Sequence, residues 1–428
     1  MRVSAISLKS FVLILAAFAA VRPAELRAQA TLLLEEPYSY DGTFAGTGHA
    51  AVYLSRICAA SPTELRRCQP GETGVVISRY HRVAGRDWFA IPLIPYLYAV
   101  EKPEQIPLIA DSKLVSFLRQ QYLQGIGIAD PDAYQLAGSA YDRTTFAFRI
   151  ETRPEQDDEL IRRLNSAPNQ ESYKLLNRNC ADFAKQIINF YHPKSIHRSI
   201  IADLGVMTPK QAAKSLVHRS KHHREMQLTT FVIPQVPGLA RSKPVHGVIE
   251  SVVLAKKYVT PVLLFHPFVV GTVEAAYWAG WRFNPGKDAL VFDPARGISG
   301  GFELPLTAAE RRSYQTSLAA LKREEELSEA LPEWRRLQAK AEPRLDATGQ
   351  PFLQMQSDRE SLRVGISRSN AFRLSAPPEL VQGMMLARIE AELKEQKPAR
   401  VSQIQLESDW RLLQAAVEAR QAALTNNP

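Results

Sequence analysis

Cysteine is scarce in this chain, with three residues in 428. No two cysteines have the Cys-x-x-Cys spacing of a metal site, and the sequence has neither a phosphate-loop pattern nor a convincing internal repeat. Six histidines also share no metal-ligand spacing: His192, His197, His222, His223, His246 and His266. We therefore expect neither a metal site nor a cofactor.

Long uninterrupted hydrophobic runs are also missing. The most apolar stretch of the second half is Tyr258–Trp281, and its longest uncharged run, Tyr258–Val273, has 16 residues. Two prolines and a histidine interrupt that run, which is short and broken for a spanning helix. We expect the stretch to pack on the protein or to make a peripheral membrane contact.

The N-terminus carries an export pattern. Arg2 and Lys9 supply positive charge, Phe11–Val21 is apolar, and Ala28-Gln-Ala30 is a small-x-small cleavage pattern. Residues 1–30 are therefore predicted to be a signal peptide, cut between Ala30 and Thr31. The apolar run of 11 residues is too short to span a bilayer, so we expect an exported protein, periplasmic or extracellular.

Positive charge predominates, with 53 Lys and Arg against 44 Asp and Glu. Residues 1–30 hold four cations and one anion, so the formal charge would fall from +9 to +6 after cleavage. That balance favours anionic surroundings such as cell-wall polymers or lipid head groups. The dense basic run His218–Arg224 reads as a solvated linker without aromatic platforms, so no nucleic-acid partner is expected.

Three regions follow the signal peptide. Strand and helix patterns alternate over 31–225, with strands at Ala50–Leu54, Gly74–Val83 and Thr144–Thr152 and a helix capped by Asp111. Residues 226–300 read as an apolar, proline-rich connector. Residues 301–428 read as an α-helical C-terminal region: Thr307 opens a capping box, and apolar stripes recur over 381–393 and 406–417. The expected fold class is α+β.

The cysteines divide into a pair and a single residue. Cys58 and Cys68 lie ten positions apart in one segment and can bond to each other. Cys180 is then left over, and an exported chain with an odd cysteine keeps a reactive thiol or pairs between molecules. The segment Ser172–Phe190 reads as a polar turn feeding a helix that begins at Cys180 and buries Phe183 and Ile187. This position favours a nucleophile.

A cysteine nucleophile needs a lowered pKa or an adjacent base, and a helix N-terminus and an imidazole can supply them. The strongest imidazole candidate is His49, which opens a strand after Gly48, where a glycine would leave room for substrate. Strand alternation puts His49 and Ala51 on one face. Asn179 caps the Cys180 helix and is expected to shape the oxyanion site as well.

These motifs resemble a known family. Gly48-His49 opening a strand, followed far downstream by Asn179-Cys180-Ala-Asp-Phe183, is similar to the NlpC-like branch of the papain-like superfamily. Because the histidine precedes the cysteine, the order resembles the circularly permuted branch with lecithin–retinol acyltransferase-like proteins and permuted amidases. The resemblance covers about residues 35–215 and implies a permuted papain-like domain over 31–225.

The resemblance also implies a third polar residue, on the strand after the histidine strand, that orients the imidazole. The Cys58–Cys68 loop separates the two strands by more than is usual in the family. His81 is the first candidate by residue type, and Ser78, Tyr80 or a main-chain carbonyl are alternatives.

The expected function is that of a secreted thiol hydrolase, an amidase or peptidase, with Cys180 as nucleophile and His49 as base. Peptidoglycan peptide is the first substrate expected. Two alternatives stay open. The same fold could act on a lipid as an acyltransferase or thioesterase, or the protein could be an inactive envelope-binding protein.

Overall fold

The structure is a computed structural model that describes residues 29–38, 47–254, 283–294, 339–356 and 361–367, with isolated positions between 302 and 336. Most of the predicted signal peptide and all of the stretch 258–281 lie outside the described residues. The expected helical stripes over 381–393 and 406–417 also lie outside them, and the helix from Thr307 is described only at isolated positions. Within the described ranges, no helix has both the length and the hydrophobicity needed to cross a bilayer.

A large mixed sheet forms the centre of the molecule, in the order β10-β9-β8-β7-β1-β2-β5-β6. Neighbouring strands are antiparallel except β8 and β9, which are parallel. This arrangement confirms the α+β class. The strands are β1 Gln29–Glu35, β2 His49–Leu54, β5 Val75–Arg79, β6 Trp88–Pro92, β7 Thr145–Glu151, β8 Thr229–Ile233, β9 Leu290–Phe292 and β10 Phe302–Glu303.

Strand β1 lies in the middle of the sheet and is apolar on both faces, as a strand covered on two sides must be. Leu32 and Leu34 contribute to one hydrophobic cluster and Leu33 to the other. The strand begins at Gln29, and Ala30 pairs with Leu54 and Ile150. The expected cleavage point after Ala30 therefore falls inside β1.

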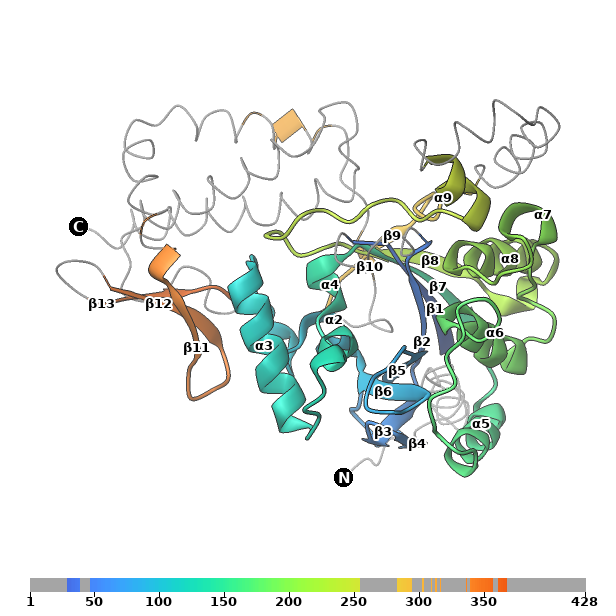
Figure 1. The fold of residues 1–428 in the computed structure, drawn as a ribbon, viewed down its shortest axis with the longest axis horizontal. Coiled ribbons are helices and arrows are strands. Elements are labelled where there is room, and N and C mark those ends of the chain that lie inside the picture. The colour runs from blue at the N-terminus through green and yellow to red at the C-terminus, as the bar shows by residue number, and fades with distance from the viewer. Residues whose placement is uncertain are drawn as a thin grey trace, which may run out of the picture.

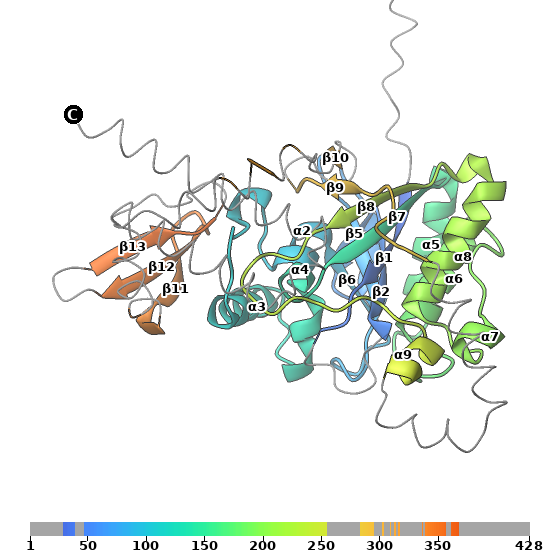
Figure 2. The same cartoon turned by 90° about the horizontal axis from the view of Figure 1, so that it is seen from above.

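Helices cover both faces of the sheet, which gives three layers (Figures 1 and 2). One face carries α2 Leu93–Tyr98, α3 Ser112–Gly125 and α4 Ser139–Asp142. The other carries α5 Pro154–Ser166, α6 Cys180–Tyr191 and α8 Pro209–His222. Shorter elements complete the described chain: η2 Pro103–Gln105, η3 Pro131–Leu136, α7 Ile200–Asp203, η4 Arg224–Met226 and α9 Val248–Leu254.

The local predictions from the sequence are confirmed in part. Asp111 caps α3 by accepting a hydrogen bond from the Leu114 backbone N–H at 2.9 Å. The expected strand from Gly74 to Val83 is shorter than predicted, because β5 ends at Arg79. The basic run at 218–224 is not a linker, since it forms the end of α8 and the start of η4. Cations in the last turn of a helix interact favourably with its C-terminal dipole.

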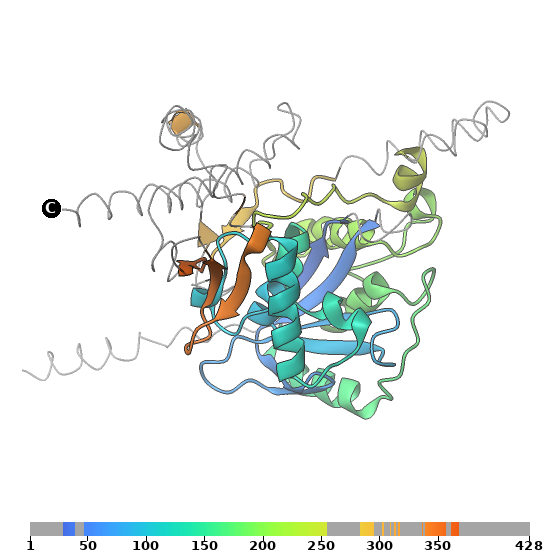
Figure 3. The ribbon, with the colours of Figure 1, turned by 60° about the vertical axis from the view of Figure 1, so that its left-hand side comes forward.

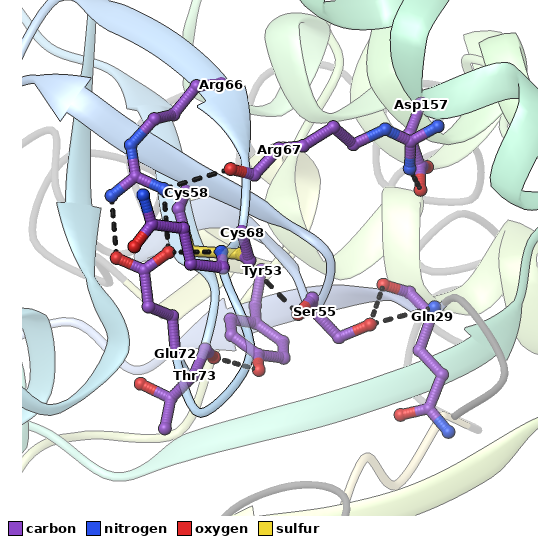
Figure 4. Close-up of a disulfide and its surroundings, with 11 residues drawn as sticks. Gln29, Tyr53, Ser55, Cys58, Arg66, Arg67, Cys68, Glu72, Thr73 and Asp157 are labelled. Carbon is purple, nitrogen blue, oxygen red and sulfur yellow. Dashed lines mark hydrogen bonds and ion pairs between the residues drawn. A yellow bond between two sulfur atoms is a disulfide. The ribbon is translucent and has the colours of Figure 1, made fainter. Parts of the chain in front are cut away.

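The segment between β2 and β5 is a disulfide-closed hairpin of β3 Ile57–Ser61 and β4 Glu64–Arg67. Cys58 and Cys68 are bonded, with Cα atoms 4.9 Å apart, as predicted (Figure 4). Arg66 makes two hydrogen bonds to the Glu72 carboxylate beside the bridge. Arg67 reaches Asp157 at the start of α5. The bridge thus stiffens a hairpin anchored to the helix layer, and it fits an exported protein.

The sequence-based boundaries at 225 and 300 are not boundaries of the sheet, because β8 and β9 extend it beyond residue 225 and β10 extends it beyond residue 300. The prediction of an all-helical region over 301–428 is wrong for residues 342–365, which form the three-stranded sheet β11 Glu342–Leu345, β12 Pro351–Gln356 and β13 Ser361–Gly365. This small sheet lies beside α3 (Figure 3). Leu353 and Val364 join the same hydrophobic cluster as α3, so the small sheet is packed against the main domain.

Candidate active site

Cys180 is the first residue of α6, as predicted, and two reciprocal hydrogen bonds fix the turn that carries it. The Asn179 side chain accepts from the Asp182 backbone N–H at 2.9 Å, and the Asp182 carboxylate accepts from the Asn179 N–H at 3.3 Å. The apolar face of α6 buries Phe183 and Ile187 against the sheet. A capping box therefore sets the position of the thiol.

The role expected for Asn179 in shaping the oxyanion site is not supported. Both hydrogens of its amide nitrogen are used, on the carbonyl oxygens of Leu175 at 2.8 Å and Met207 at 2.9 Å. Arg198 holds the same loop by donating to the Asn177 carbonyl at 3.2 Å and to Asp182 at 2.5 Å. Asn179 is thus a positioning residue that ties the turn before Cys180 to the chain near Met207.

Cys180 carries the free thiol of the described residues, and the residue is 7% exposed. Burial is the main influence on it and raises its pKa to about 11. Nearby backbone N–H groups of Ala50, Ala181 and Cys180 lower the pKa and so oppose that rise. The resting residue is therefore a neutral thiol, and it needs a base to become nucleophilic.

His49 opens β2. Ser78 in β5 and Tyr80, which directly follows β5, set the orientation of its ring. The ring stacks on Tyr80, with centroids 5.2 Å apart, and its Nε2 lies 2.9 Å from Ser78 Oγ. Ser78 donates its one hydrogen to the Ala50 carbonyl at 2.8 Å. Ser78 must then accept from Nε2–H, which leaves the lone pair on Nδ1. In this tautomer Nδ1 is the ring nitrogen that can accept a proton.

The imidazole lies beside a buried polar network. Glu35 is directly opposite His49 in the β1–β2 register, and its carboxylate accepts from the Tyr96 hydroxyl. Arg143 lies 3.4 Å from the second oxygen of that carboxylate. Burial is the main cause that lowers the pKa of His49, and the nearby positive charge of Arg143 lowers it further. His49 is therefore neutral at neutral pH.

The third polar residue at the imidazole is Ser78 rather than His81. His81 is exposed in the turn after β5, and its ring contacts Tyr173 at 5.1 Å between centroids. By contrast, Ser78 lies within β5, on the face that His49 shares with Ala51 and Tyr53. Residue type pointed to His81, but the strand register selects the serine.

Cys180 and His49 approach the Ala50 peptide from opposite faces of the sheet. Cys180 packs in the cluster that contains Ala50 and Val52, whereas the His49 ring lies on Tyr80 in the other cluster. The β2–β5 ladder stops at Val52, so the strands are not paired at this end. The Ala50 N–H then lies near the sulfur, while the Ala50 carbonyl accepts from Ser78. Both candidate groups therefore lie beside Ala50, and no hydrogen bond joins Cys180 to His49 among the described residues.

Gly48 does not leave space for a substrate. Its φ is +73°, and a Cβ at this position would collide with the Glu35 carbonyl oxygen and lie 3.1 Å from Val245 Cγ1. The glycine is needed because β1 passes close to the chain at the entry to β2. Its contribution to the site is to let His49 start the strand beside Glu35.

Arg79 is a buried charge near the site that the sequence analysis did not identify. Its guanidinium makes two hydrogen bonds to Asp87, at 2.8 and 2.7 Å, and lies 5.1 Å from the centroid of Phe183, one turn after Cys180. Its Nη1 is buried without a hydrogen-bond partner among the described residues. The alternation of β5 could have predicted an inward-facing arginine, but not its partner.

Comparison with known proteins adds no evidence on function beyond this geometry. The chain matches no protein-family model, no curated protein and no solved structure.

Proposed function

We propose that the protein is an exported thiol hydrolase in which Cys180 is the nucleophile and His49 the general base. The observation that supports this most is that a buried thiol at the start of α6 and an imidazole whose tautomer is set by Ser78 both lie beside Ala50 of β2. The helix position, the histidine-first order and the polar residue on the following strand all agree with a permuted papain-like domain. That fold assignment is part of the proposal.

The chemistry follows from the protonation states. His49 Nδ1 takes the thiol proton as Cys180 Sγ attacks a carbonyl carbon, and a C–S bond forms. Backbone N–H groups at the start of α6 stabilise the oxyanion, as donors in a dry site do effectively. The C–N bond then breaks and the amine leaves with the proton from His49. Water then attacks the thioester carbonyl carbon and gives one proton to His49. The C–S bond breaks, a carboxylic acid leaves, and the proton returns from His49 to the sulfur.

The substrate proposed first is an amide of cell-wall peptide. Export, the positive net charge and the family resemblance support this choice, because peptidoglycan is an anionic polymer outside the cytoplasm. The proposed reaction needs neither a metal ion nor an organic cofactor.

Turnover of peptidoglycan peptides by three variants tests the proposal. Cys180→Ser should abolish product release while the Tm stays close to wild type. His49→Gln should lower kcat/KM by about 10²- to 10⁴-fold, the usual range for positioned acid–base catalysis. His81→Gln is the matched control and should leave kcat/KM unchanged. Retained turnover in Cys180→Ser would refute the assignment.

A second candidate is a binding protein that has lost turnover. The burial of Cys180 and its raised pKa favour this reading, because both keep the sulfur protonated. Incubation of the wild type with activated esters, followed by intact-mass analysis, separates the two. A thioester adduct on Cys180 supports the hydrolase, and unmodified protein that still binds wall polymer supports the binding function.

A further inference from the structure

Large hydrophobic side chains are exposed in one region close to the candidate site. Among the described residues, five of the six exposed large hydrophobics fall in two segments, and Leu345 is the sixth. Their exposed fractions run from 49% to 81%. We call these five residues the apolar patch: Leu175, Leu176, Ile200, Ile201 and Leu204.

Hydrogen bonds hold the two segments of the apolar patch side by side. Arg198 donates to the carbonyls of both Leu176, at 3.4 Å, and Gly205, at 2.9 Å. The Asn179 amide nitrogen joins Leu175 to Met207 in the same way. The patch is therefore one surface, and it borders the turn that carries Cys180. A contiguous apolar surface on a water-exposed face indicates an interaction site.

The exposed charges in the turn that carries Leu175 and Leu176 are positive. They belong to Lys174 and Arg178, and Arg178 also lies 3.9 Å from the buried Asp87 carboxylate. The two carboxylates between Ser172 and Gly205, Asp182 and Asp203, are both buried. Apolar side chains next to exposed lysine and arginine are typical of proteins that bind at the interface of an anionic membrane.

The chain next to the apolar patch continues the apolar character. Helix α9 contacts α7, which carries Ile200 and Ile201, and Figure 1 shows the two helices at the same end of the molecule. The sequence then enters the uncharged run Tyr258–Val273.

We propose that the apolar patch docks on the surface of an anionic phospholipid bilayer. The leucine and isoleucine side chains enter the boundary between head groups and acyl chains, and Lys174 and Arg178 contact lipid phosphates. This orientation directs the turn before Cys180 toward the membrane. The docking does not depend on turnover, so it can hold or fail separately from the hydrolase assignment.

Vesicle flotation of the full-length chain tests the docking. Vesicles of phosphatidylcholine with about one third phosphatidylglycerol should retain the wild type at low salt, whereas phosphatidylcholine alone should retain much less. The double variant Ile200→Ser/Ile201→Ser should lower the partition coefficient about tenfold or more, because it lacks the isoleucine CH₂ and CH₃ groups that the membrane would bury. Cys180→Ser should bind like the wild type.

Leu345→Ser is the matched control, because Leu345 is exposed on β11, at the opposite side of the molecule from α7 (Figure 1). Every variant carries the same termini, so any binding by other segments is constant. Equal binding by wild type and double variant would refute the proposal. A fall in Tm or a change in oligomeric state confined to the double variant would also refute it, since the patch would then be covered by the chain itself or by a second copy. Loss of soluble-peptide turnover with unchanged flotation would assign the surface to a peptide instead.

Discussion

At the scale of single residues, the tautomer of the His49 imidazole depends on Ser78, which takes no direct part in the proposed reaction. Ser78 fixes the His49 tautomer because its hydroxyl has one hydrogen, which the Ala50 carbonyl takes. The side chain thereby connects the base to Ala50, whose N–H lies near the Cys180 sulfur. His81, three positions later, is exposed and lies against Tyr173.

Removing the Ser78 hydroxyl should slow the alkylation of Cys180 more than removing the His81 ring does. Ser78→Ala deletes the acceptor for Nε2–H, and we expect the rate of iodoacetamide alkylation of Cys180 to fall by about tenfold near neutral pH, a part of what a positioned base contributes. Ser78→Thr should restore most of the rate. An unchanged rate in Ser78→Ala, or an equal fall in His81→Ala, would contradict the role of Ser78.

The buried Arg79–Asp87 pair supplies a prediction on stability. The two side chains are 2% and 8% exposed, so neutralising one leaves the other buried without its counter-charge. Asp87→Asn should lower the free energy of unfolding by about 3–5 kcal/mol, measured by urea titration. Asp158→Asn is the control, since its exposed ion pair with Arg67 should change stability little. Similar losses in both variants would show that the buried Arg79–Asp87 pair contributes no more to the free energy of unfolding than the exposed pair does.

At the scale of elements, a hairpin and a helix turn prepare the site. The β3–β4 hairpin separates β2 from β5 in sequence, yet the two strands pair directly in the sheet. The sequence between them is therefore a hairpin inserted between two paired strands and not a break in the fold. The capping box of α6 has the same preparatory role at the thiol.

The disulfide should stabilise the protein by restricting the unfolded chain. The bridge closes a loop with a sequence separation of 10. Replacing both cysteines by serine should therefore lower the free energy of unfolding by about 2–3 kcal/mol on the chain-entropy model. Dithiothreitol should lower the wild type by a similar amount and leave the double variant unchanged. A reductant effect that persists in the variant would point to Cys180 instead.

At the scale of the whole molecule, the sheet separates two hydrophobic clusters, and the candidate site lies where they approach each other. One cluster contains Tyr80 and Tyr96, and the other contains Cys180 and Phe183. Burial from both sides lowers the pKa of His49 and raises that of Cys180, so the pH dependence of stability reports on the packed site.

Stability should depend on pH through His49 with a definite sign. Because the folded pKa lies below the unfolded value of about 6.5, the unfolded state gains protons first as the pH falls. The stabilisation is present above about pH 6.5 and is lost as the pH falls toward the folded pKa. The wild type should lose about 1–3 kcal/mol more than His49→Gln between pH 7.5 and 4.5, by urea titration. Parallel losses in the two proteins would show that His49 is not buried as a neutral ring.

The sequence by itself determined the features that depend on neighbouring residues. It specified the Cys58–Cys68 pair, the Asp111 cap and the start of α6 at Cys180, because spacing, capping chemistry and helix periodicity are local. Tertiary structure alone decided which polar side chain meets His49, since β-strand register and side-chain alternation place Ser78 on the shared face and leave His81 in solvent. Three further features likewise depend on segments distant in sequence. They are the acceptors of the Asn179 amide hydrogens, the partner of Arg79, and the strands β11, β12 and β13. Such contacts are fixed only when the two hydrophobic clusters pack against the sheet.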